Sequence, residues 1–316
     1  MKYSAVNAKV AGMSAKLLNQ DDYFMLCSNL DPESALKALK SHITYSQMTD
    51  DLTSIRSVTF PLLYSDYKKI SSFINDTNMK KYLESLLLKR ELHTVKQVLR
   101  ANYDSGEYKG KDFAQQLKGS KIYEFIRNTY KPNTSLSELE IFLDLYYYTN
   151  LWKATNKYLT GANKAIAVKI SGTEIDMYNI LRIYGLKKHY KSEKAKASKE
   201  LMYKYVLPIN YKLAAHDIHS MIDADSSNEV LELIKATRYG VYFSNPNIDA
   251  GSAIGENLLY KAVKDASKSS RRKNPNSIAT IIHYLGQKEA ELRNIISIFE
   301  AVNYSFDPKE AMSQVN

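Results

Sequence analysis

Two histidines one helical turn apart form the pattern in this sequence that comes nearest to a metal site. His216 and His219 are separated by two residues, and Asp217 and Asp223 lie close to them. Residues three positions apart share one face of a helix, so both imidazoles could reach the same ion. A zinc site needs a third and a fourth ligand, and nothing else in the sequence points to them. We therefore interpret both histidines as surface or interdomain residues and predict no metal site.

The residue patterns that usually carry catalysis are missing. The sequence contains no G-x-x-x-x-G-K-[ST] loop, no G-x-G-x-x-G turn and no G-x-S-x-G elbow, which would cradle a phosphate or present a nucleophile. Cys27 is the only cysteine and follows an apolar stretch at residues 23–26, so we expect a small buried side chain. The sequence therefore predicts no catalytic residue and no cofactor.

The chain is basic, with a formal net charge of +10. Such a charge favours an acidic partner, whether nucleic acid, an anionic membrane surface or an acidic protein face. A/T-rich codon usage is an equally simple explanation, because Lys, Tyr, Asn and Ile are all abundant.

Two basic runs stand out within this charge. The lysines of residues 187–204 spread around a helix, which favours a solvated face. Residues 268–275 read KSSRRKNP and are expected to form an exposed basic loop. The candidate contacts with an acidic partner are Lys187, Lys188, Lys191, Arg271, Arg272 and Lys273.

A short polar motif recurs along the chain. Asp176-x-x-Asn179-Ile180 is echoed by Glu291-x-x-Asn294-Ile295, and more weakly by Thr94-x-x-Gln97-Val98. Asparagine in the middle of a helix is mildly unfavourable unless its amide finds partners. We therefore predict a buried polar packing contact, made by Asp176, Asn179, Arg182, Arg100, Lys288, Glu289, Glu291 and Asn294.

The elements that must position this motif are helices. Glycine and proline are scarce, apolar residues recur at helical spacing, and no alternating segment indicates a sheet, so we predict an all-α fold. Asp31-Pro32 is expected to begin a helix, with Asp31 as its N-cap, and Pro61 is expected to end one. Gly286 is expected to join two helices or to mark a bend where something packs close, and Ser171–Gly172 to form a hinge between two more.

The three echoes suggest one module used three times. Because each echo falls toward the end of a segment, we predict helical domains at residues 1–106, 107–205 and 206–316. No stretch is long and apolar enough to span a bilayer, so a soluble cytoplasmic protein is expected.

The order of these motifs resembles the C subunit of bacterial and archaeal V/A-type ATPases, whose eukaryotic counterpart is the d subunit of the vacuolar proton pump. The resemblance runs the full length of the chain. It departs from the family pattern at Thr94 and Gln97, and at Ser297 in place of an arginine. The matching segments are Tyr3–Leu18 with Asp22-Tyr23, Asp176–Arg182, and Tyr284 with Lys288-Glu289, Glu291 and Arg293–Ile295.

The resemblance implies three similar helical domains around a pseudo-threefold axis, forming a funnel with a central cavity. It implies a non-catalytic central-stalk socket that receives the shaft, built from the D and F subunits, and sits on the membrane rotor ring of proteolipid c/K subunits. The socket would transmit torque on the cytoplasmic face of the membrane. The rival interpretation is a basic helical-repeat scaffold that binds nucleic acid, but Tyr190, Tyr203 and Tyr205 flank the first basic run without interleaving as a stacking platform.

Overall fold

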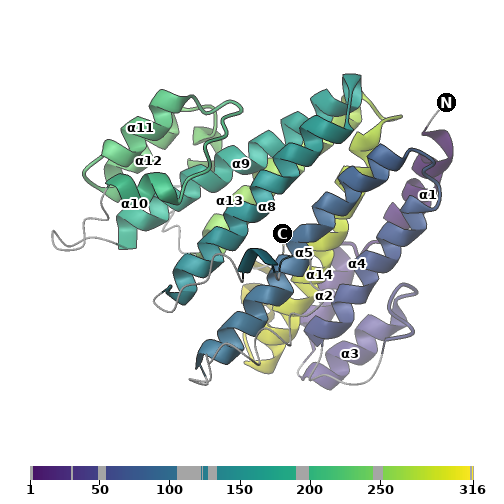
Figure 1. Cartoon of the computed structure of the whole chain (residues 1–316). Coiled ribbons are helices and arrows are strands. Elements are labelled where there is room, and N and C mark those ends of the chain that lie inside the picture. The colour runs from purple at the N-terminus through teal and green to yellow at the C-terminus, as the bar shows by residue number, and fades with distance from the viewer. Residues whose placement is uncertain are drawn as a thin grey trace. The chain divides into compact units, whose positions relative to one another are not determined.

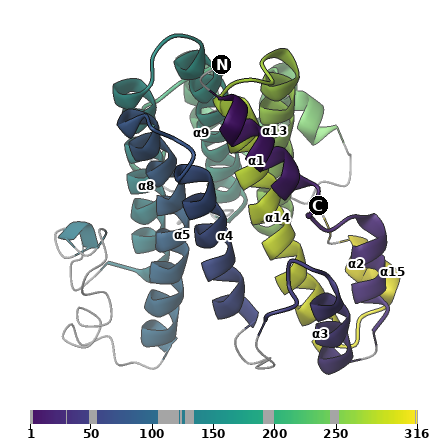
Figure 2. The same cartoon turned by 90° about the vertical axis from the view of Figure 1, so that its right-hand side faces the viewer.

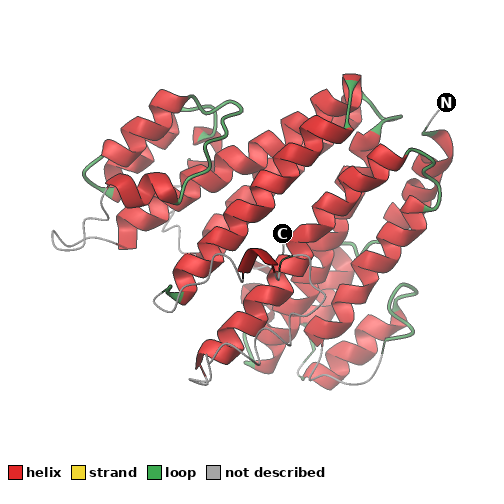
Figure 3. Cartoon of the chain, in the orientation of Figure 1, coloured by secondary structure: helices red, strands yellow, loops and turns green. Residues whose placement is uncertain are grey.

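The structure is a computed structural model in which the described residues are 3–29, 31–48, 55–104, 122, 124–126, 134–189, 199–244, 252–313 and 315. Within these ranges the regular elements are all helices, and no strand occurs (Figure 1, Figure 3). The predicted all-α fold is confirmed. Each described helix is also too short or too polar to traverse a membrane.

The chain divides into two compact units. Unit 1 combines the two chain ends, Met1–Asn75 and Ser267–Asn316, whereas unit 2 is the continuous stretch Asp76–Ala266. These boundaries differ from those predicted for three domains, and the threefold division stays a prediction.

Unit 2 is organised around two long helices, α8 (Leu136–Tyr158) and α9 (Gly161–His189), with α5 (Thr77–Asp104) packed against α8. A hairpin of two short helices packs against α9 (Figure 1). The core of unit 2 is apolar and includes Met177, Ile180 and Ile183 of α9. The remaining elements are α10 (Lys199–Lys204), α11 (Ala215–Asp223), α12 (Ser227–Ala236), η3 (Gly240–Phe243) and most of α13 (Ser252–Lys273).

Unit 1 is organised around α14 (Ile278–Asn303), which contacts the shorter helices from both chain ends (Figure 2). The predicted start of α3 is confirmed, because the Asp31 side chain accepts the Ser34 N–H and Pro32 takes the first helical position. The helices that contact α14 are α1 (Ser4–Ser14), α2 (Gln20–Cys27), α3 (Pro32–Ser41), α4 (Ile55–Ser71) and α15 (Pro308–Ser313).

The boundary predicted at Pro61 is wrong, because α4 runs through this residue from Ile55 to Ser71. A proline inside a helix removes one backbone hydrogen bond and costs about 3 kcal/mol. The turns beyond it bury Leu63, Tyr67 and Ile70. That burial offsets the loss and lets the helix continue.

The structure also differs from the predictions at two glycines, because no junction of two helices lies at either position and no described residue packs close to Gly286. α14 is continuous through Gly286, and a Cβ added there would meet no described atom within 4 Å. α9 is continuous through Ser171 and Gly172. Gly172 has a different role, because its missing side chain makes room for Tyr211: an added Cβ would lie 2.9 Å or less from three carbon atoms of that side chain.

Replacing Gly172 by alanine should therefore destabilise the protein by about 1–3 kcal/mol through overpacking against Tyr211. The matched control is Gly185→Ala in the same helix, where an added Cβ meets no described atom within 4 Å. This control should stabilise by about 0.5–1 kcal/mol, since alanine is the better helix former. Urea unfolding of both variants measures the difference, and equal unfolding midpoints would contradict the packing role of Gly172.

Candidate functional site

The acidic residue of the unit 2 motif binds the backbone of the loop that precedes α11. Asp176 is fully buried in α9. Its carboxylate accepts the backbone N–H groups of Tyr211, Lys212 and Leu213 at 3.0, 2.7 and 2.9 Å. These three hydrogen bonds hold the loop that leads into the α11–α12 hairpin against α9. A buried carboxylate is tolerated here because its lone pairs are satisfied.

The carboxylate of Asp176 also accepts a hydrogen bond from a tyrosine that follows the hairpin. The Tyr239 hydroxyl donates to Asp176 Oδ2 at 2.6 Å. Burial, reinforced by the negative charge of Asp176, raises the pKa of Tyr239 well above its usual range. The hydroxyl therefore stays protonated and remains a donor. Asp176 thus holds both ends of the hairpin.

Asn179, one turn further along α9, holds the loop as well. Its amide donates to the Leu207 carbonyl at 3.1 Å and accepts the Leu207 N–H at 2.9 Å. The amide thus finds its partners in the backbone. Arg182, which the motif places near it, instead reaches Asp144 of α8 at 3.3 Å.

The arginines of the motif form ion pairs with α8. Lys96 lies 2.5 Å from Asp144, so this carboxylate receives two cations. Arg100 pairs with Glu140 through two hydrogen bonds, at 2.5 and 3.0 Å. These contacts connect α5, α8 and α9 within unit 2.

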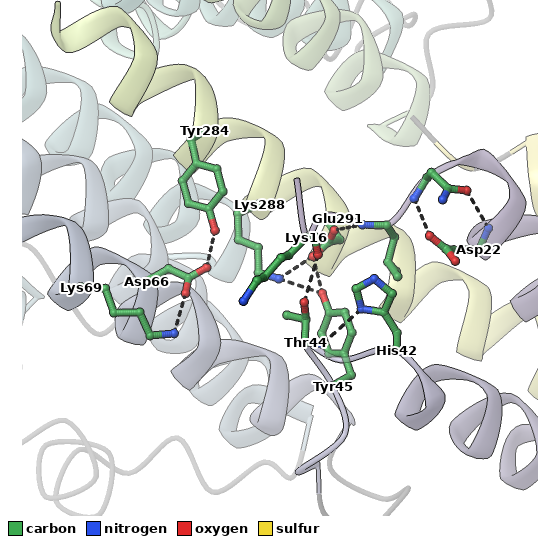
Figure 4. Close-up of polar contacts among 12 residues, drawn as sticks. Lys16, Asp22, His42, Thr44, Tyr45, Asp66, Lys69, Tyr284, Lys288 and Glu291 are labelled. Atoms are coloured by element: carbon green, nitrogen blue, oxygen red, sulfur yellow. Dashed lines mark hydrogen bonds and ion pairs between the residues drawn. The ribbon is translucent and has the colours of Figure 1, made fainter. Parts of the chain in front are cut away.

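The acidic residue of the unit 1 motif lies in an ion pair that is almost fully buried (Figure 4). Lys288 Nζ lies 2.5 Å from Glu291 Oε1, and both side chains are 2% exposed. The Tyr45 hydroxyl donates to Glu291 and accepts a hydrogen bond from Lys288 at 2.9 Å. Glu291 Oε2 also accepts the Leu18 N–H at 2.5 Å.

A second tyrosine–carboxylate pair stands one turn before Lys288. The Tyr284 hydroxyl donates to Asp66 of α4 at 2.6 Å, and Lys69 lies 3.1 Å from the same carboxylate (Figure 4). Burial and the hydrogen bond to Asp66 raise the pKa of Tyr284 well above its usual range. The hydroxyl stays protonated, so this link between α14 and α4 persists at neutral pH.

The two units use the same arrangement. In each, a carboxylate on the long helix accepts the N–H of a buried leucine just before a two-helix hairpin and the hydroxyl of a tyrosine just after it. Asp22 and Asp217, at the third position of α2 and of α11, each bond back to the backbone N–H of the N-cap residue. In unit 1 the hairpin comes from the start of the chain and the long helix from its end.

Sequence reasoning found the acidic residues but missed Leu18, Tyr45, Leu213 and Tyr239. A signal was present: residues 18–39 and 213–234 place buried apolar residues at identical steps. The matching pairs are Leu18 with Leu213, Leu26 with Met221, Cys27 with Ile222, Ala35 with Val230 and Leu39 with Ile234.

The other predicted motif residues differ in exposure. Asn294 is buried on α14, and Glu289 beside Lys288 is half-buried. Their role as a packing contact between repeats stays a prediction, as it does for the rest of the motif.

The predicted basic contacts fall into two groups. Lys187 donates to the Ala224 carbonyl, and burial lowers the pKa of Lys187. Lys188 is half-buried near the end of α9. Lys191 lies outside the described residues. Arg271, Arg272 and Lys273 are all exposed. They form the last turn of α13, so the expected basic loop at 268–275 is wrong for these residues.

Among the described residues, no group of three or more His, Cys, Asp or Glu is placed to hold a metal ion. His219 Nδ1 instead lies 2.9 Å from the Tyr203 hydroxyl, and His216 lies 3.1 Å from Asp217. The hydrogen bonds and ion pairs of Asp176, Arg182 and Glu291 described above connect elements within each unit.

Comparison with known proteins identifies the family. The model of the ATP synthase (C/AC39) subunit family matches residues 6–112 and 109–314. The A-type ATP synthase C subunit of Methanosphaera stadtmanae is 23% identical over 99% of this chain and 87% of the relative. The C subunit of Thermococcus onnurineus is 22% identical over 97% of this chain and 88% of the relative. That of Methanobrevibacter smithii is 27% identical over 54% of this chain and 44% of the relative.

Proposed function

The chain belongs to the ATP synthase (C/AC39) subunit family, and on that premise we propose that it is the central-stalk socket of a rotary V/A-type ATPase. In this role it binds the shaft, built from the D and F subunits, on one side and the membrane rotor ring on the other. It transmits torque between them as a peripheral protein on the cytoplasmic face of the membrane.

The observation that carries this proposal is similarity over almost the whole chain. The family model reaches from the first helix to the last, and the match with the Methanosphaera stadtmanae relative covers 99% of this chain. A match of this extent includes both units, so the proposal does not depend on one shared motif.

The buried polar contacts support a mechanical role. A part that transmits torque must resist the separation of its helices. Glu291 and Asp176 each hold a hairpin to a long helix through buried hydrogen bonds, which gain strength in a low-dielectric interior. The polar residues of the motif are thus used for structure, in agreement with a non-catalytic role.

Binding to purified partners tests the proposal. The protein should bind a D–F shaft with a Kd below about 1 μM, and it should bind the detergent-solubilised rotor ring. A nucleic-acid scaffold would instead bind nucleic acid with an affinity that falls steeply as salt is raised. Tight salt-dependent binding to nucleic acid, without binding to shaft or ring, would overturn the proposal.

The exposed cations at the end of α13 should contribute to assembly. Reversing Arg271, Arg272 and Lys273 to glutamate is expected to weaken binding to the shaft or ring about tenfold, because charges at the rim of an interface steer association. The measurement is the Kd for each partner at low and at physiological salt.

The matched control spreads an equal charge change over exposed residues elsewhere, with Lys37, Lys153 and Lys261 changed to glutamate. This variant should bind with nearly unchanged affinity. If the two triple variants bind alike, the end of α13 is not a partner contact, although the family assignment stands.

A further inference from the structure

A short helix lies against the hairpin in both units. In unit 2, α10 packs against α11, and in unit 1, α15 packs against α2. The two short helices share a sequence pattern, Lys199-Glu200-Leu201-Met202 in α10 and Lys309-Glu310-Ala311-Met312 in α15. Both follow the long helix of their unit, so they are equivalent parts of one repeated module.

In unit 2 the short helix contacts the outer side of α11, where His219 and Ser220 are exposed. The Tyr203 ring lies 5.4 Å from the ring of His219, and its hydroxyl lies 2.9 Å from His219 Nδ1. Lys199 of the same helix pairs with Asp223. An aromatic residue flanked by lysines therefore binds this side of the hairpin.

In unit 1 the equivalent side of α2 is apolar and exposed. The positions that match His219 and Ser220 hold Phe24 and Met25, which are 58% and 49% exposed. The position that matches Tyr203 holds Ser313. The inward residues of the two helices match in burial, because Leu26 and Cys27 are as buried as their unit 2 counterparts. The fold thus accepts polar residues on the outer side, and the apolar pair in unit 1 needs another explanation.

We propose that Phe24 and Met25 form a docking surface for an amphipathic helix at the end of the shaft, with apolar side chains flanked by Lys or Arg. The inference rests on the proposed function for the identity of the partner. Apolar side chains exposed singly are ordinary, whereas neighbouring ones form the kind of patch that marks an interaction site. Unit 2 carries polar residues at both matching positions.

The charge around the surface defines the chemistry of the partner. Residues 19–34 contain no Lys or Arg, although the whole chain carries a net charge of +10. Asp22 and Asp31 are used as helix caps, whereas Asp21 and Glu33 are exposed. The outward carboxylates favour a cationic border on the partner, as Lys199 provides for α11 in unit 2.

The test replaces the apolar pair with the residues that α11 carries, in the double variant Phe24→His/Met25→Ser. Because the equivalent helix already accepts these residues, the variant should unfold like the wild type. Its Kd for the purified D–F shaft should rise about tenfold or more, as expected for the loss of a central apolar anchor. Its Kd for the detergent-solubilised ring should not change.

The matched control is Val241→Ser in unit 2, which removes an apolar side chain that is 69% exposed and should leave both affinities unchanged. Shaft binding equal to wild type, or a loss of affinity for the ring alone, would overturn the docking surface. If the wild-type protein itself does not bind the shaft, the proposed function fails instead.

Discussion

Replacing Glu291 by alanine is expected to destabilise unit 1 by about 3–5 kcal/mol, the usual effect of breaking a buried ion pair. The substitution leaves the Lys288 ammonium without its carboxylate at 2% exposure. It also leaves the Leu18 N–H and the Tyr45 hydroxyl without their acceptor. Glu291 lies at the contact between α14 and residues from the other end of the chain, so the whole unit should loosen.

Hydrogen exchange measures this effect where it arises. Amides of α14 should exchange faster in Glu291→Ala, and the free energy of unfolding in urea should fall. The double variant Lys288→Met/Glu291→Gln removes both charges and should recover part of the loss, because an uncharged pair needs no compensation.

Glu33→Ala is the control, since this exposed carboxylate contributes at most about 1 kcal/mol through the helix dipole. A Glu291→Ala protein that unfolds like the Glu33→Ala protein would show that the buried pair adds nothing to stability.

Replacing Asp176 by alanine should destabilise unit 2 by a similar amount, about 3–5 kcal/mol. Three backbone N–H groups and the Tyr239 hydroxyl lose their acceptor together, and each unsatisfied buried group costs about 1–3 kcal/mol where water cannot replace the acceptor. Asp176→Asn should lose less, because its carbonyl oxygen still accepts hydrogen bonds.

The fluorescence of Trp152 reports this change, because it is the only tryptophan and lies in α8 of unit 2. Glu84→Ala is the matched control, since Glu84 is an exposed carboxylate on α5 of the same unit, and its effect should stay within about 0.5 kcal/mol. Equal unfolding midpoints for Asp176→Ala and Glu84→Ala would rule out a structural role for the buried carboxylate.

Local signals predicted the helices and the buried acidic residues well. Helical spacing, scarce glycine and the Asp31-Pro32 start of α3 are properties of short stretches of sequence. The structure contains the helices that they predict. The motif at Asp176 and Glu291 is also visible in the sequence, because a polar residue repeated inside apolar stripes is unusual.

The wrong predictions concern residues whose structural role depends on contacts with residues far away in the sequence. Gly172 and Gly286 look alike in sequence, yet only Gly172 faces a side chain, that of Tyr211. Local geometry disfavours Pro61 inside a helix, but burial further along α4 prevails. The partners of Glu291 at Leu18 and Tyr45 lie more than 240 positions away, and no local pattern connects them.

The composition of unit 1 from both chain ends has a consequence for synthesis on the ribosome. Unit 2 is one continuous stretch, so all of its residues are present once Ala266 has emerged. The first 75 residues leave the ribosome long before α14 does. Until α14 is translated, Leu18 and Tyr45 have no Glu291, and the nascent hairpin must wait for the last part of the chain before its unit can fold.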